Sequence, residues 1–96
     1  MRGGWVYIMT NKRNGTLYIG VTAQLGERTW LHKEGLGSQF CKKYGLTMLV
    51  WAEHHDRIEN AIQRETSLKR WKRAWKIALI ETFNPEWRDL SLERLD

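Results

Sequence analysis

Two runs of β-branched and aromatic residues stand near the start of the chain. Residues 5–9 and 16–22 have this composition, and the five residues 11–15 between them are turn formers that end in Asn-Gly. The pattern predicts a β-hairpin whose strands each present one face to a core.

The two tyrosines of the hairpin are expected on the same face. If the hairpin folds symmetrically about residues 12 and 13, Tyr7 lies directly opposite Tyr18 as a cross-strand pair. Gly20 lacks a side chain on that face, which predicts a place where a ligand could approach the backbone closely.

The rest of the chain alternates between helical and extended patterns. In order, it predicts a helix over 25–33, a surface loop with a short turn over 39–44, a strand over 48–55, and an amphipathic helical region over 58–81 that continues through, or restarts after, a break at 69–71. Asp56 and Glu59 have the spacing of a capping box at the start of the last region, and Asn84-Pro85 ends it. Together these elements predict an α+β fold with a small three-stranded antiparallel sheet flanked by helices.

Length and composition narrow the class of protein. A chain of 96 residues with 42% hydrophobic and 28% charged residues fits one globular domain over 1–96. Its single cysteine excludes an internal disulfide and a cysteine-rich zinc site. Because no apolar run approaches the roughly 18 residues of a membrane span, and the first ten residues lack a signal peptide's apolar core, we expect a cytoplasmic protein with no membrane partner.

The formal net charge of +5 suggests a polyanionic partner. The positive charge lies before residue 84, and the segment that follows is net negative. A basic domain of this size is equally compatible with a soluble protein that binds no nucleic acid. Charge alone therefore leaves both interpretations open.

A carboxylate interrupts the apolar stripe of the helical region. The stripe runs through Ile58, Ala61, Ile62 and Leu68, and Glu65 occupies a position where it demands another apolar residue. Burying an unpaired carboxylate costs several kcal/mol. Glu65 is therefore expected either in an ion pair with Arg28 or Arg64, or as a general base or a ligand of Mg²⁺, which keeps most of its hydration shell.

Basic residues gather on one side of a helical wheel drawn over the same region. The members of this group are Lys69, Lys72, Arg73 and Lys76, and Trp71 and Trp75 fall on the opposite side, where we expect them to pack in the core. The basic side is expected either to track nucleic-acid phosphates or to be a solvated surface. Lys42 and Lys43, in the surface loop over 36–46, are the second candidate surface.

Six separated positions carry a resemblance to a known family. They are Tyr7 in Trp-Val-Tyr, Tyr18 in Tyr-Ile-Gly, Arg28, His32, Glu65 and Asn84, and in this order they resemble the GIY-YIG endonuclease superfamily over about residues 4–90. The likeness is greatest to its small stand-alone bacterial members. The first triplet departs from the family pattern, because Trp5 and Val6 replace its glycine and isoleucine.

The resemblance implies a function and a role for each residue. Members of the family hydrolyse phosphodiester bonds with one divalent cation, here Mg²⁺ or Mn²⁺, and need no organic cofactor. By this likeness Glu65 holds the metal, Tyr7 deprotonates or orients the attacking water, and Tyr18 positions water or phosphate. Arg28 then stabilises transition-state charge, His32 adds a polar contact, and Asn84 supports the site.

Two other classes compete with a DNA endonuclease. One is a catalytically inactive nucleic-acid-binding module that uses the basic helix 69–76, and the other is a protein-interaction domain, suggested by six tryptophans. The presence of all the polar site residues favours the nuclease. Since the chain carries no recognition module, we expect low sequence specificity, with single-stranded or structured DNA as the substrate.

Overall fold

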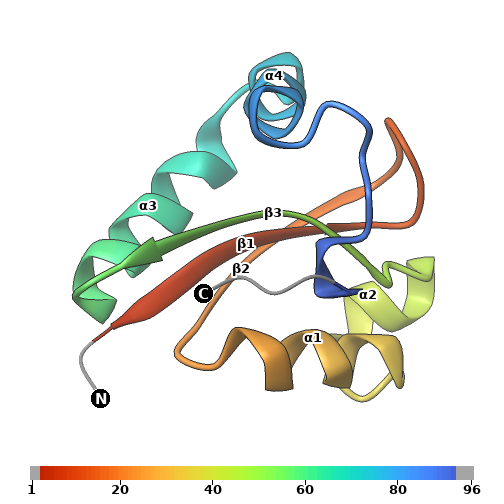
Figure 1. Ribbon diagram of the computed structural model, residues 1–96, viewed down its shortest axis with the longest axis horizontal. Helices are drawn as coiled ribbons and strands as arrows, with labels where there is room; N and C mark the ends of the chain where they lie inside the picture. The colour runs from red at the N-terminus through yellow and green to blue at the C-terminus, as the bar shows by residue number, and fades with distance from the viewer. Residues whose placement is uncertain (1–2, 93–96) are drawn as a thin grey trace.

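Three antiparallel strands form the middle layer of the fold, and helices cover both faces of the sheet (Figure 1). The computed structural model describes residues 3–92. The elements are β1 (Gly4–Thr10), β2 (Leu17–Thr22), α1 (Leu25–Lys33), α2 (Gln39–Tyr44), β3 (Met48–His55), α3 (Ile58–Arg70), α4 (Arg73–Phe83) and the 3₁₀ turn η1 (Leu90–Leu92). The expected fold class, a three-stranded antiparallel sheet flanked by helices, is confirmed. Within the described range, none of the helices has the length and apolar character needed to cross a membrane.

The hairpin forms, but its register differs by two residues from the predicted one. Tyr7 lies opposite Gly20, and Tyr18 lies opposite Met9, so the prediction that the two tyrosines face each other directly is wrong by two residues. The hairpin turns about residues 13 and 14 instead of 12 and 13, and Asn14 adopts a left-handed conformation there with φ of 58°. A shift of two residues keeps the side chains on the same face, so the tyrosines remain diagonal neighbours.

Gly20 makes room for a side chain of the protein itself. A Cβ atom at this position would lie 2.5 Å from the Tyr7 hydroxyl oxygen and 2.6 Å from its ring carbon Cζ. The expectation that a ligand approaches the backbone here is therefore wrong. The glycine is needed because the phenol ring of Tyr7 lies across it.

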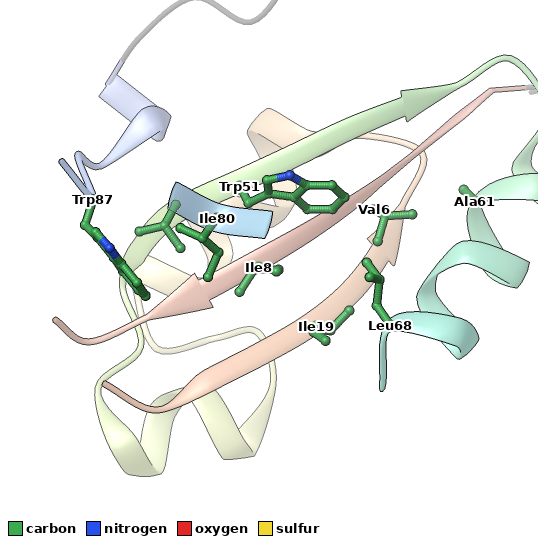
Figure 2. Packing of buried hydrophobic residues seen from close by; sticks show 9 residues of the cluster. Val6, Ile8, Ile19, Trp51, Ala61, Leu68, Ile80 and Trp87 are labelled. Carbon is green, nitrogen blue, oxygen red and sulfur yellow. The ribbon is translucent and has the colours of Figure 1, made fainter. Parts of the chain in front are cut away.

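The alternation of side chains along the strands divides the core into two layers. Val6, Ile8 and Ile19 face α3 and α4, where they pack with Trp51, Leu68 and other apolar side chains (Figure 2). On the opposite face, Tyr7 packs with residues of α1, α2 and the segments around them. The hairpin tyrosines consequently lie under α1 and α2, whereas Glu65 belongs to a helix on the other side of the sheet.

The helical region restarts after a break, as one of the two alternatives predicted. The backbone is extended at Trp71 and Lys72, with ψ of 150° and 147°, and α4 begins at the next residue. The predicted capping box does not form. The N-cap of α3 is Arg57, which makes no side-chain cap hydrogen bond, and Arg57 instead donates to the Glu59 carboxylate at 3.4 Å.

Candidate active site

A buried hydrogen bond joins β1 to α1 beneath the site. The Tyr7 hydroxyl lies 3.0 Å from Nε2 of His32, and the two residues are 0% and 2% exposed. The pKa of Tyr7 is raised far above its ordinary value, mainly by burial, and the nearby Arg28 guanidinium lowers the pKa only in part. Burial, followed by the charge of Arg28, also lowers the pKa of His32. Both groups are therefore neutral near pH 7.

The second nitrogen of the His32 ring makes no hydrogen bond to any residue that the structure describes. This nitrogen, Nδ1, is buried, and a Cβ atom at Gly37 would lie 2.5 Å from it. With the ring proton on Nε2, that nitrogen donates to the Tyr7 oxygen and Nδ1 is an unmet acceptor; with the proton on Nδ1, the Tyr7 hydroxyl donates to Nε2. In both cases the two side chains hold each other in place.

Tyr18 connects this buried pair to the surface. Its ring makes an edge contact with His32 at a centroid distance of 5.6 Å and lies 6.3 Å from the ring of Tyr7. Unlike Tyr7, Tyr18 is only half-buried, and it lines two surface hollows of about 340 Å³ each. Tyr18 is thus the phenol that a substrate can touch.

Arg28 lies in one of these hollows beside Tyr18. It precedes His32 by one turn of α1, so the two side chains share a helix face as expected. The hollow is completed by Leu31, Leu36, Gly37 and Ser38. A half-buried guanidinium beside an accessible phenol is well suited to bind a phosphate.

Glu65 forms an ion pair that the sequence did not predict. Its side chain is 16% exposed, and one carboxylate oxygen lies 3.1 Å from Nζ of Lys69, one turn further along α3. The expected ion pair between Glu65 and Arg64 does not form, because Arg64 donates to Glu53 at 3.0 Å. The structure gives no ion pair between Glu65 and Arg28. Ile62, expected in the same apolar stripe, is 46% exposed, so α3 is turned to place Glu65 nearer the core.

The two faces of the sheet meet at the edge strand β2. Lys69, the partner of Glu65, lines the second hollow together with Tyr18 and Lys76. The rest of that hollow is formed by Leu17, Ile19 and Phe40. The ion pair from one face and the phenol from the other therefore lie beside a common opening at β2.

The donor atoms near Glu65 fit a hydrated magnesium ion better than a fully protein-ligated metal. No group of three or more His, Cys, Asp or Glu side chains suited to a metal occurs among residues 3–92. Glu65 offers one partly buried carboxylate that already attracts a cation, the Lys69 ammonium. Mg²⁺ is commonly held by one or two carboxylates, with water and substrate phosphates completing its coordination.

The basic group lies on two helices and does not form one stripe. Arg73 donates to the carbonyl oxygens of Asn14 and Gly15 at 2.7 and 2.6 Å, which fastens the hairpin loop to α4. Lys72 lies in the break, with its Nζ 5.7 Å from the ring centroid of Trp75. Of the predicted group, Lys69 and Lys76 line the hollow beside Tyr18.

The two tryptophans of this region differ in burial. Trp71 is partly buried and packs against the core, as expected. Trp75 is 57% exposed and makes an edge contact with Trp71 at 6.2 Å, so its predicted place in the core is wrong. The break changes the direction of α4 relative to α3. A helical wheel drawn over one continuous helix therefore assigns Trp75 to the wrong face.

Asn84 is placed in a structural network. The register of β1 and β3 shifts between Ile8 and Met9 and leaves Val50 without a partner in β1. Asn84 donates to the Val50 carbonyl at 3.1 Å and to the Arg88 carbonyl at 2.9 Å, and accepts from the Arg88 backbone N–H at 3.1 Å. Its two amide N–H groups are therefore both used by the backbone.

Phe40 is the residue at the site that the sequence analysis missed. It lines the hollow with Tyr18 and the two lysines, and its ring stacks on that of Tyr18 at 6.2 Å. The available signal was its spacing of four from Tyr44, which places two aromatic rings on one helix face. Lys42 and Lys43, of the same helix α2, are exposed.

The chain belongs to the GIY-YIG family, a family of nucleases: the model of the GIY-YIG catalytic domain matches residues 3–78. Among its relatives, a UPF0213 protein of Syntrophus aciditrophicus is 33% identical over 90% of this chain and 98% of its own. A second, from Staphylococcus haemolyticus, is 32% identical over 80% and 93% of the two chains. The solution NMR structure of a UPF0213 protein from Bacillus halodurans has the same fold, with a TM-score of 0.57, 24% identity, and coverage of 91% of this chain and 92% of that one.

Proposed function

We propose that the protein is an endonuclease that hydrolyses phosphodiester bonds of DNA with the help of one divalent cation, Mg²⁺ or Mn²⁺. The observation that carries this proposal is that Tyr18 lines two hollows at β2, one together with Arg28 and the other together with Lys69, the ion-pair partner of Glu65. Tyr18, Arg28 and Glu65 each supply something that phosphodiester hydrolysis requires: a hydroxyl to position water or phosphate, a fixed positive charge, and a carboxylate that attracts a cation.

Arg28 and Tyr18 are the residues assigned to direct substrate contact. The guanidinium of Arg28 donates to a phosphate oxygen and stabilises the charge that develops on the phosphate in the transition state. The Tyr18 hydroxyl, in the same hollow, orients the phosphate or the attacking water. Glu65 would hold the divalent cation, which would supply Lewis acidity to make water more acidic and to neutralise charge on phosphate oxygens.

Tyr7 and His32 act through the residues around them. The Tyr7 hydroxyl has no exposed surface and a raised pKa, which disfavours proton abstraction by a phenolate. We therefore assign to this pair the positioning of α1, and hence of Arg28, against the hairpin. Asn84 supports the fold in the same indirect way, through the backbone of β3.

The finer features of the function follow from the surface. Lys69 and Lys76 beside the site, with Lys42 and Lys43 on α2, provide contacts to the phosphate backbone without contacts that read bases. We propose low sequence specificity, a preference for single-stranded or structured DNA, and action in the cytoplasm.

The competing function is a binding module without catalysis, and it has one observation in its favour. Lys69 neutralises Glu65 at 3.1 Å, so the carboxylate could serve the fold as half of an ion pair. Glu65→Gln distinguishes the two. If Glu65 holds the cation, cleavage of labelled DNA in Mg²⁺ or Mn²⁺ disappears while DNA affinity is retained. Full cleavage by the variant, or undiminished cleavage by the parent in chelator, contradicts the metal role of Glu65. Binding of DNA by the parent without cleavage in either cation contradicts the nuclease proposal.

A further inference from the structure

Aromatic rings continue from Tyr18 to the outer surface of α2. Phe40 stacks on Tyr18 at a centroid distance of 6.2 Å and an interplanar angle of 29°. Tyr44 follows at 4.8 Å from Phe40. Phe40 and Tyr44 are 42% and 46% exposed, so nearly half of each residue faces solvent. An unbroken aromatic row thus leads outward from the phenol of the site.

The exposure of these rings follows from how α2 is seated. The helix buries Cys41, which is 2% exposed, in the core on the α1 side of the sheet. Ser38 caps the helix by accepting from the backbone N–H groups of Phe40 and Cys41 at 3.1 and 3.4 Å. Phe40 and Tyr44, four residues apart, are thereby fixed on a face that no other described element covers completely. Grouped apolar surface of this kind often marks a binding site.

Positive charge accompanies the exposed rings. Lys69 and Lys76 line the same hollow as Phe40. On the outer side, Nζ of Lys43 lies 5.4 Å from the ring centroid of Tyr44. Flat apolar surface bordered by ammonium groups matches a nucleotide, which carries an aromatic base on a phosphate backbone.

We propose that Phe40 and Tyr44 form a base-stacking subsite, which takes an unpaired base of the nucleotide next to the phosphate held at Tyr18 and Arg28. The subsite rests on the proposed function in taking nucleic acid as the ligand and Tyr18 and Arg28 as the phosphate site, but not on catalysis. Bases within a duplex already stack on their neighbours, so this surface favours a single strand or an unpaired end. The exposed rings of α2 would therefore account for the proposed preference for single-stranded DNA.

The test measures binding of a single-stranded oligonucleotide with 2-aminopurine at successive positions, in chelator so that no cleavage occurs. The parent protein is expected to quench the fluorescence of 2-aminopurine at one or two positions. Phe40→Leu keeps apolar cover on Tyr18 but removes the ring. It should abolish the quenching and weaken binding about 5-fold to 150-fold, the range that corresponds to ~1–3 kcal/mol for one stacked base.

Three controls separate stacking from other effects. Phe83→Leu changes a ring that is 51% exposed at the end of α4 and should leave quenching and affinity unchanged. An abasic nucleotide at the quenched position should weaken binding by the parent but cost Phe40→Leu little more, since the two changes remove the same contact. Tyr44→Leu provides a second variant if Phe40→Leu unfolds, as judged by its melting temperature.

The outcomes also distinguish this subsite from the proposed nuclease activity. Parent-like quenching and affinity in folded Phe40→Leu and Tyr44→Leu would overturn the subsite, even if the protein cleaves DNA. An equal loss of affinity for duplex and single strand would likewise overturn it. If quenching depends on Phe40 but no cation supports cleavage, the subsite stands and the nuclease proposal fails.

Discussion

Lys69 and Glu65 lie one turn apart on α3, and the ammonium nitrogen of Lys69 is 3.1 Å from a carboxylate oxygen of Glu65. The pair has an unequal environment, because the side chain of Glu65 is 16% exposed and that of Lys69 is 55% exposed. The carboxylate is therefore held in place while the ammonium has freedom to leave. A divalent cation at Glu65 would take the place of the ammonium, which then becomes available to a phosphate.

The first prediction concerns this competition. Lys69→Gln should tighten the binding of Mn²⁺ in the absence of nucleic acid by about twofold to fivefold, which corresponds to the ~0.4–1 kcal/mol of a half-exposed ion pair. The affinity is read from the free Mn²⁺ signal in electron paramagnetic resonance. Lys76→Gln, which removes a charge lining the same hollow but not the partner of Glu65, is the matched control. An equal effect of both variants would mean that only the general field had changed.

The second prediction concerns the buried pair of Tyr7 and His32. Tyr7→Phe leaves Nε2 of His32 unpaired beside an already unpaired Nδ1, and should lower the free energy of unfolding by about 1–3 kcal/mol. The measurement is urea denaturation at pH 7. Tyr18→Phe, in the half-exposed ring, should cost less than about 0.5 kcal/mol yet lower the cleavage rate more. Equal losses of stability in the two variants would show that the hydrogen bond of the buried Tyr7 hydroxyl contributes no more to stability than the exposed hydroxyl of Tyr18.

The third prediction concerns salt dependence. Lys69→Gln with Lys76→Gln should weaken binding of single-stranded DNA and reduce the slope of log K against log salt by about 0.7 for each lost phosphate contact. Titrations at three salt concentrations suffice. Lys72→Gln should change the slope little, because this lysine lies in the break beside Trp75. A slope that responds only to Lys72→Gln would place the phosphate contacts on the outer side of α4.

The fourth prediction concerns Asp89 and acid. Burial raises the pKa of Asp89, but hydrogen bonds from Lys33, Ser91 and the backbone N–H of Leu49 outweigh it and hold the pKa below its usual value. Its contribution to stability is therefore present above the unfolded pKa of about 3.9 and is lost as the pH falls through the lower folded pKa. The free energy of unfolding should drop between about pH 5 and pH 3.

Asp89→Asn tests this assignment. At pH 7 the variant should be less stable by about 1–3 kcal/mol, and its stability should change less than that of the parent between about pH 5 and pH 3. Asp56→Asn is the control, since the Asp56 side chain is fully exposed and 3.9 Å from His54. If the acid dependence survives Asp89→Asn unchanged, other carboxylates account for it.

The sequence predicted the three strands, α1 and the helical region of α3 and α4, because each has a strong local signal, whereas α2 was expected only as a short turn within a surface loop. These signals are local: the β-branched runs predict strands, and the glycines after residue 33 and Asn84-Pro85 end helices within a few residues. Register was harder, since it depends on the left-handed Asn14 in the loop and on the bulge at Val50. Neither can be read from periodicity.

The partners of individual side chains were predicted less well than the positions of the elements along the chain. The anomaly at Glu65 was visible in the pattern of α3, but its partner Lys69 was not, because the wheel treated Lys69 as part of a basic stripe. The exposure of Trp75 and the hydrogen bonding of Arg73 to the hairpin loop were missed for the same reason: the break after α3 changes the direction of α4. The roles that the resemblance gives to the site residues stay predictions.

The stretch that follows α4 closes the molecule. Asn84 and Asp89 bond to the backbone of β3 at Val50 and Leu49, while Trp87 is 2% exposed within the core on the α3 side. All three lie beyond residue 78, where the match to the family's catalytic domain stops. A domain boundary drawn at that residue would leave β3 with unmet backbone hydrogen bonds and an open core. The unit that folds is thus longer than the match over 3–78, and a chain ending at residue 78 should be less stable because β3 would lose these partners at Leu49 and Val50.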